Sequence, residues 1–138
     1  MKKVLLLSTC SLALAAIGPT ARAGSLTDPD AIRAIVGEAA DCPFTVQLGI
    51  AATLRHRSWV MARPLHGVYG WHARHNAGEK PAVWVSARLA WSQSVTNDPA
   101  RQALYFGNRQ DVEKGTFLGL TQTAVLGTGK HATYFFKP

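Results

Sequence analysis

The sequence predicts an α+β fold in which helices come first and a small C-terminal antiparallel β-hairpin or sheet comes last. Over residues 28–57 and 81–95, apolar residues recur at the three- and four-residue spacings of helix faces. After residue 102 the apolar segments become short, namely "ALYF", "GLTQTAVLG" and "KHATYFF", and are rich in the β-branched and aromatic residues that favour strands.

The N-terminal segment "MKKVLLLSTCSLALAAIGPTARAG" has the charged start, apolar run and small-residue cleavage site of a secretory signal peptide. We expect cleavage after Ala23, which divides the chain into a signal peptide, 1–23, and one domain, 24–138. The apolar run is shorter than the roughly 18 to 20 residues of a membrane span, so no stable membrane insertion is expected. The mature protein should be exported to the periplasm or the exterior, and should be monomeric.

Loss of Lys2, Lys3 and Arg22 with the signal peptide lowers the formal net charge from +7 to +4. A mildly basic surface suits an acidic polymer such as a cell wall, although a nucleic-acid binder would show a similar charge. The charge alone leaves both partners open, together with a surface that is basic only for solubility.

The first helix is expected to begin at Thr27 or Asp28 as its cap, with Pro29 in its first turn. The stripe of Ile32, Ile35, Val36 and Ala39 should face the core. Pro43 then disfavours helix in the residue before it and can start the next helix, so the two should form a hairpin.

The second helix is expected over "PFTVQLGIAATLRHR", where small residues allow a neighbouring element to approach closely. Residues 58–80 show no clean periodicity and read as a long loop, a type of segment that is often functional. Pro81 should open a third helix, "PAVWVSARLAWSQSV", and the last two strands should form a hairpin across "GTGK".

Glu38 lies at the edge of the apolar stripe of the first helix and is therefore expected to be half buried. Partial burial disfavours the ionised form of a carboxyl group, as a general acid working near neutral pH requires. The alternative is an ordinary boundary residue paired with Arg33, Arg55 or Arg57. Cys42, the one cysteine of the mature chain, is expected to be a buried structural thiol rather than a nucleophile, because no histidine lies near it in the sequence.

Three segments, in order, resemble the SleB-type cell wall hydrolases, which include the spore-cortex-lytic enzymes. The helical segment "IVGEAADCPFTVQLGIAATLRHR" is similar to the opening motif of that family, "DPARQALYFGN" to its Asp-Pro segment, and "LGTGKHATYFF" to its terminus. The positions that correspond to the family motifs are Glu38, Ala39, Gln47, Gly49, Ala51, Leu54, His56, Arg57, Asp98, Pro99, Ala103, Phe106, Gly129, His131 and Tyr134.

The chain departs from the family pattern at four places. Ala40-Asp41-Cys42 replaces Arg-Gly-Glu, His56 replaces the usual Asn, Arg101-Gln102 replaces Gly-Gly, and Thr133 replaces Phe. These departures keep Glu38 but remove the second glutamate of the opening motif.

The resemblance implies that residues 24–138 form a catalytic domain with a lysozyme-like α+β fold. It implies a lytic transglycosylase that acts on peptidoglycan glycan strands and binds no nucleic acid. In that chemistry Glu38 protonates the glycosidic oxygen between N-acetylmuramic acid and N-acetylglucosamine, then takes the proton of the muramic acid 6-hydroxyl as a 1,6-anhydro ring closes. A hydrolase would instead need a second carboxylate about 5 to 9.5 Å away. The candidates for that carboxylate are Asp41, Glu79, Asp98, Asp111 and Glu113.

Several other residues are candidates for binding the sugar. Tyr69, Trp71, Tyr105 and Tyr134 can stack on sugar faces, whereas Phe106 is expected in the core. Gln47, Asn108 and His131 can position the sugar by hydrogen bonds, and a structural role is the alternative for His131. No cofactor and no metal is expected.

The rival enzymatic reading uses His66, His72 and His75 with Glu79 as the site of a peptidoglycan amidase or peptidase. Their spacing matches no familiar zinc motif, and Arg74 between them would repel a cation. The third reading is a non-catalytic module that only binds the cell wall.

Overall fold

A computed structural model describes residues 27–57 and 80–138. The helices are α1 (Asp28–Ala39), α2 (Phe44–Arg57), α4 (Pro81–Gln93) and the short α5 (Arg109–Glu113). The strands are β1 (Tyr105–Asn108), β2 (Thr121–Leu126) and β3 (Thr133–Lys137), with a 3-10 turn, η1 (Gly129–His131), before β3. These elements confirm the α+β class and the predicted order of helices and strands.

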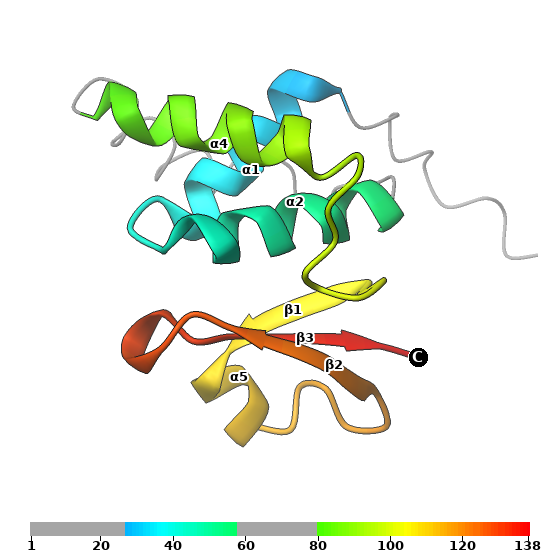
Figure 1. Ribbon diagram of the computed structural model, residues 1–138. Coiled ribbons are helices and arrows are strands. Elements are labelled where there is room, and N and C mark those ends of the chain that lie inside the picture. The colour runs from blue at the N-terminus through cyan, green and yellow to red at the C-terminus, as the bar shows by residue number, and fades with distance from the viewer. Residues whose placement is uncertain (1–26, 58–79) are drawn as a thin grey trace, which may run out of the picture.

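Figure 1 shows α1, α2 and α4 gathered on one side of the sheet and α5 on the other. Helix α2 lies between the other two long helices and the sheet, and it contacts α1, α4, β1 and β2. This central position explains why the run from Val46 to Leu54 is buried on every side of α2. None of the described helices is both long and apolar enough to cross a membrane.

The helix boundaries follow the predicted caps. The Thr27 hydroxyl accepts a hydrogen bond from the Asp30 backbone N–H at 3.4 Å, so Thr27 is the cap of α1. Pro81 lies in the first turn of α4 as predicted, where a missing N–H costs nothing. The indole N–H of Trp91 donates to Asp28 at 2.8 Å and fastens the end of α4 to the start of α1.

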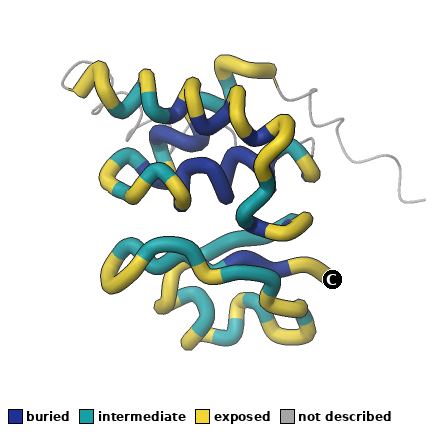
Figure 2. Tube along the Cα trace, viewed as in Figure 1, coloured by how far each residue is buried: buried dark blue, intermediate teal, exposed yellow. Residues whose placement is uncertain are grey.

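The sheet of the described residues is antiparallel with strand order β1-β3-β2, so the last strand is the central one. The predicted hairpin between β2 and β3 is confirmed. Residue pairs such as Phe106 with Phe135 place alternate side chains on one face, toward the helices. Phe135 is fully buried and packs toward Gly49 of α2, so it marks the point where the sheet meets the helical core. Figure 2 shows β3 buried along part of its length.

Candidate functional site

A groove of about 630 Å³ lies where the helices meet the edge of the sheet. Its helical side carries Glu38, Cys42, Ile50 and Arg57, and its sheet side carries all four residues of β1 with Thr133. Residues of α5 and η1 complete it, among them Asp111 and His131. We call this cavity the seam groove.

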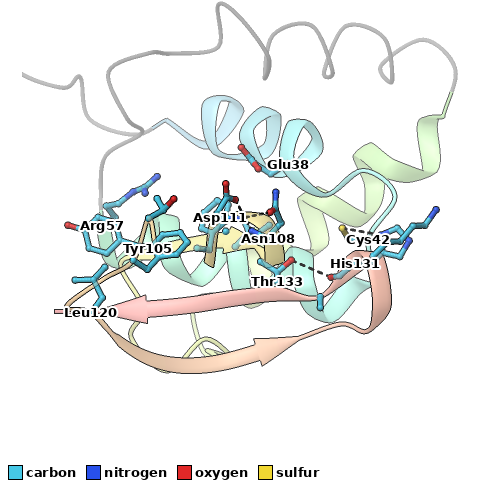
Figure 3. A pocket seen from close by; sticks show the side chains of 16 residues that line it. Glu38, Cys42, Arg57, Tyr105, Asn108, Asp111, Leu120, His131 and Thr133 are labelled. Atoms are coloured by element: carbon cyan, nitrogen blue, oxygen red, sulfur yellow. Dashed lines mark hydrogen bonds between the residues drawn. The ribbon is translucent and has the colours of Figure 1, made fainter. Parts of the chain in front are cut away.

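Glu38 lies in the seam groove, on the last turns of α1, and faces the sheet across the opening (Figure 3). Its side chain is exposed, so the expected half burial is wrong. On a helical wheel, Glu38 points in a direction between those of the buried residues Ala31 and Ala34. Near the end of α1, however, this side of the helix faces the groove and not the core. The site therefore offers a carboxylate that a ligand in the groove can reach.

Three of the predicted sugar-binding residues line the seam groove: Tyr105, Asn108 and His131. Tyr105 and Asn108 begin and end β1, and His131 ends η1. Asn108 also caps α5, because its side chain accepts a hydrogen bond from the Asp111 N–H at 3.0 Å. The hydrogen bond at the end of β1 therefore holds two residues of the groove, Asn108 and Asp111, next to each other.

Two predicted residues do not line the groove. Gln47 is buried: its Nε2 donates to the Ala39 carbonyl at 2.9 Å and its Oε1 accepts from Ser86, so it joins α1, α2 and α4 inside the helical core. Tyr134 pairs with Gly107 and Val125 on the face of β3 opposite to Phe135, away from the helices. Their placement favours structural roles.

Other predicted residues lie outside the described part of the chain. These are Tyr69 and Trp71, and the histidine set of the rival reading, His66, His72, His75 and Glu79. Within residues 27–57 and 80–138, no cluster of three or more His, Cys, Asp and Glu side chains could hold a metal ion.

Among the described candidates for a second carboxylate, Asp111 is the one that lines the seam groove. Its Oδ2 accepts the backbone N–H of Asn108 at 3.0 Å, which completes a capping box at the start of α5. The others have partners elsewhere: Asp98 is 2.8 Å from His56, Asp41 3.4 Å from Lys80, and Glu113 2.7 Å from Arg109.

Cys42 and His131 meet at one end of the seam groove, where Cys42 Sγ lies 3.7 Å from His131 Nδ1 (Figure 3). Cys42 is half buried, and burial together with the negative charges of Asp41 and Glu38 raises the pKa of its thiol. Sequence reasoning missed this pair because 89 positions separate the two residues. The resemblance at Gly129 and His131 marked the histidine, but gave no sign of its partner.

Comparison of the chain with models of known protein families, with curated proteins and with solved structures finds no match. The geometry of the seam groove therefore carries the functional argument. It combines an exposed carboxyl group, hydrogen-bonding side chains, a tyrosine and a thiol–imidazole contact.

Proposed function

We propose that the protein is an exported lytic transglycosylase with a lysozyme-like arrangement, which cleaves peptidoglycan glycan strands with Glu38 as its acid and base. The observation that carries the proposal is the position of Glu38, an exposed carboxyl group at the helical wall of a groove whose other wall is a small antiparallel sheet. The predicted signal peptide and the three segments that resemble SleB-type hydrolases support it.

The seam groove has the size and the chemistry that a glycan segment needs. Its volume of about 630 Å³ lies within the roughly 300 to 1,000 Å³ of small-molecule sites. Tyr105 offers a ring face for an apolar sugar face, while Asn108 offers amide donors and an acceptor. Arg57 and Lys130 add positive charge, which suits the carboxylates of an acidic wall polymer.

Substrate binding supplies the burial that Glu38 lacks in the free protein. A glycan strand laid along the groove displaces water from the carboxyl group, and a drier environment favours its protonated form. The protonated carboxyl donates to the glycosidic oxygen as the bond breaks. The resulting carboxylate accepts the proton of the muramic acid 6-hydroxyl, whose oxygen closes the anhydro ring, so one acid suffices.

The backbone near β1 gives independent support to the resemblance. Arg101 and Gln102 have φ angles of 55° and 63°, a left-handed conformation that glycine adopts far more readily than other residues. They stand where the SleB-type pattern has Gly-Gly. Gly-Gly would favour this backbone shape, so its presence here with less favourable residues supports the resemblance.

The test is digestion of purified sacculi with product analysis by mass spectrometry. Glu38→Gln keeps the shape of the side chain but removes the acidic proton, so we expect a loss of activity of about 10²- to 10⁴-fold. The matched control is Glu113→Gln, because Glu113 is an exposed glutamate paired with Arg109 outside the groove. It should keep wild-type activity, and wild-type products should carry anhydromuramic ends.

Other outcomes would replace the proposal. Wild-type turnover by Glu38→Gln would exclude Glu38 as the acid. Reducing ends, lost again in Asp111→Asn, would indicate a two-carboxylate muramidase. Free stem peptides with the glycan strands left uncut would indicate an amidase, and binding to sacculi without any cleavage would indicate a wall-binding module.

A further inference from the structure

A thiol and an imidazole lie together at one end of the seam groove, and the proposed reaction of Glu38 uses neither of them. Cys42 precedes Pro43, whose carbonyl accepts the first backbone hydrogen bonds of α2, from Val46 and Gln47. His131 ends η1, and Ala132 alone separates it from β3. The hairpin of helices and the hairpin of strands therefore bring Cys42 Sγ to 3.7 Å from His131 Nδ1.

We propose that Cys42 and His131 form a nucleophile and base pair that cleaves a peptide amide bound in the seam groove. A thiol beside an imidazole, both open to a cavity, is the arrangement that nucleophilic catalysis at a carbonyl requires. This activity does not rest on glycan cleavage by Glu38. It gives the same groove a second bond to cut.

The edge of the sheet favours a peptide as the substrate. Among the described strands, β1 pairs with β3 alone, and all four of its residues line the seam groove. An edge strand can bind an extended peptide through backbone hydrogen bonds, here ahead of Asn108, whose N–H already donates to Asp111 Oδ2. Asn108 at the end of β1 pairs with Thr133, two residues after His131, so a peptide that follows β1 runs toward the thiol.

The reaction balances with water as the only co-reactant. His131 accepts the proton of the Cys42 thiol as sulfur attacks the amide carbonyl, a C–S bond forms, and the C–N bond breaks. The imidazolium gives its proton to the departing amine. Water then attacks the thioester, with His131 accepting a water proton and returning it to sulfur, which releases the carboxylic acid and regenerates the thiol.

The electrostatics explain why this thiol needs a base. Several charged or titratable groups lie near Cys42 or along the groove. They are Asp41, which precedes Cys42 in the sequence, Glu38 on α1, Arg57 on α2, Asp111 on α5, and Lys130 and His131 on η1. Burial, then Asp41 and Glu38, raise the pKa of Cys42, so the thiol is protonated at neutral pH. A protonated thiol becomes a nucleophile when an adjacent base removes its proton.

The first test uses p-nitrophenyl acetate as an acyl probe on the full chain, with the acetylated residue located by peptide mass spectrometry. We expect acetylation of Cys42 in the wild type and in Lys137→Ala, a control at an exposed position that does not line the groove. At neutral pH, His131→Ala should slow acetylation by about 100-fold, the lower end of the range for a general base.

The pH profile separates a base from a structural contact. In the wild type the acetylation rate should reach a plateau near neutral pH and fall in acid, because only a neutral imidazole can accept the thiol proton. In His131→Ala the rate should instead rise tenfold per pH unit until the thiol ionises, above the roughly 8.5 of a free cysteine. The wild-type profile decides the question even if His131→Ala does not fold. A wild-type rate without the plateau, or acetylation at another residue, overturns the proposal.

The second test measures new amino groups released from sacculi by dinitrophenylation. Wild type and Glu38→Gln should release them, and Cys42→Ser should not. Release by Glu38→Gln, which lacks the proposed glycan acid, together with its loss in Cys42→Ser separates the two activities. No amino groups from the wild type, or equal release by Cys42→Ser, overturns the proposal and leaves the proposed role of Glu38 untouched.

Discussion

The helical layer and the sheet are packed with side chains of very different size. The interior of the helical layer is rich in alanine, and small side chains let helix axes approach closely. Its buried alanines are Ala31, Ala34, Ala39, Ala51, Ala52, Ala87 and Ala90. Contacts made along whole helices distribute stability over many positions, and Figure 2 shows this continuous buried interior.

The sheet, in contrast, depends on a few aromatic residues. In its strands only Phe135 and Phe136 are buried. Phe135 packs toward Gly49 of α2 and lies 6.1 Å from the Phe106 ring. Phe136 stacks on Phe117 at 4.3 Å on the other face of the sheet, so each face has its own aromatic anchor.

This difference shows that the seam groove depends on a narrow contact. Its helical wall belongs to a well-packed layer, while its sheet wall is held at its distance from α2 by Phe135 and Gly49. Changes at this contact should therefore affect both the stability and the groove, whereas changes to exposed apolar residues should affect neither.

The largest effect is expected for Phe135→Ala. Because Phe135 is fully buried, its truncation removes transfer free energy and leaves a cavity, and should lower the free energy of unfolding by about 3 to 5 kcal/mol. The control is Leu118→Ala, because Leu118 is 86% exposed and its loss should change stability by less than about 0.5 kcal/mol. Urea denaturation measures both. Equal small losses would mean that the sheet does not rest on Phe135.

A smaller loss is expected for Gly49→Ala, at the other side of the same contact. A Cβ at Gly49 would lie 2.5 Å from Leu126 Cδ1 and 2.8 Å from Phe135 Cζ, so the substitution should destabilise the protein by about 1 to 3 kcal/mol. In an open helix the same change would instead stabilise by about 1 kcal/mol, so the sign of the effect is the test.

The double variant Gly49→Ala with Leu126→Ala identifies the source of that loss. Removing the Leu126 side chain opens space for the new methyl group, so the double variant should lose less than the sum of the two single variants. Simple additivity would show that the methyl group does not meet the sheet at this point.

Most of the helical layer could be predicted from the sequence because its signals are local. The cap at Thr27, the prolines at 29, 43 and 81, and the apolar stripes each act within one or two helix turns. The strands could be recognised from composition and the hairpin turn, but not the central place of β3, which long-range pairing decides. Helix α5 was missed, although Asn108 and Asp111 have the spacing of a capping box.

The site was less predictable because it depends on where elements end and what faces them. A helical wheel gave the direction of Glu38 but not the open space beyond α1, so its burial was overestimated. Gln47 has a side chain that could bind a sugar, but both ends of its amide make hydrogen bonds inside the helical core. The contact of Cys42 with His131 follows from tertiary packing alone, and no local pattern predicts it.

The smallest effect is expected in the loop that joins α4 to β1 and so connects the two layers. Arg101 and Gln102 hold left-handed φ angles, and the Gln102 N–H donates to Asp98 Oδ2 at 2.6 Å, a contact that fixes this backbone. Glycine removes the steric cost of that conformation but is more flexible in the unfolded chain. We therefore expect Arg101→Gly and Gln102→Gly each to raise the free energy of unfolding by about 0.5 to 1 kcal/mol.

Two matched controls separate the removal of steric strain from the backbone from the effect of losing the side chain. Arg101→Ala removes the same side chain but keeps a Cβ, so it should leave stability within about 0.5 kcal/mol of wild type. Gln110→Gly places glycine in the helical backbone of α5, where it should destabilise by about 1 kcal/mol. Destabilisation by Arg101→Gly equal to that of Gln110→Gly would show that the loop does not hold the left-handed turn. It would also remove the backbone support for placing Arg101-Gln102 at the Gly-Gly of the SleB-type pattern.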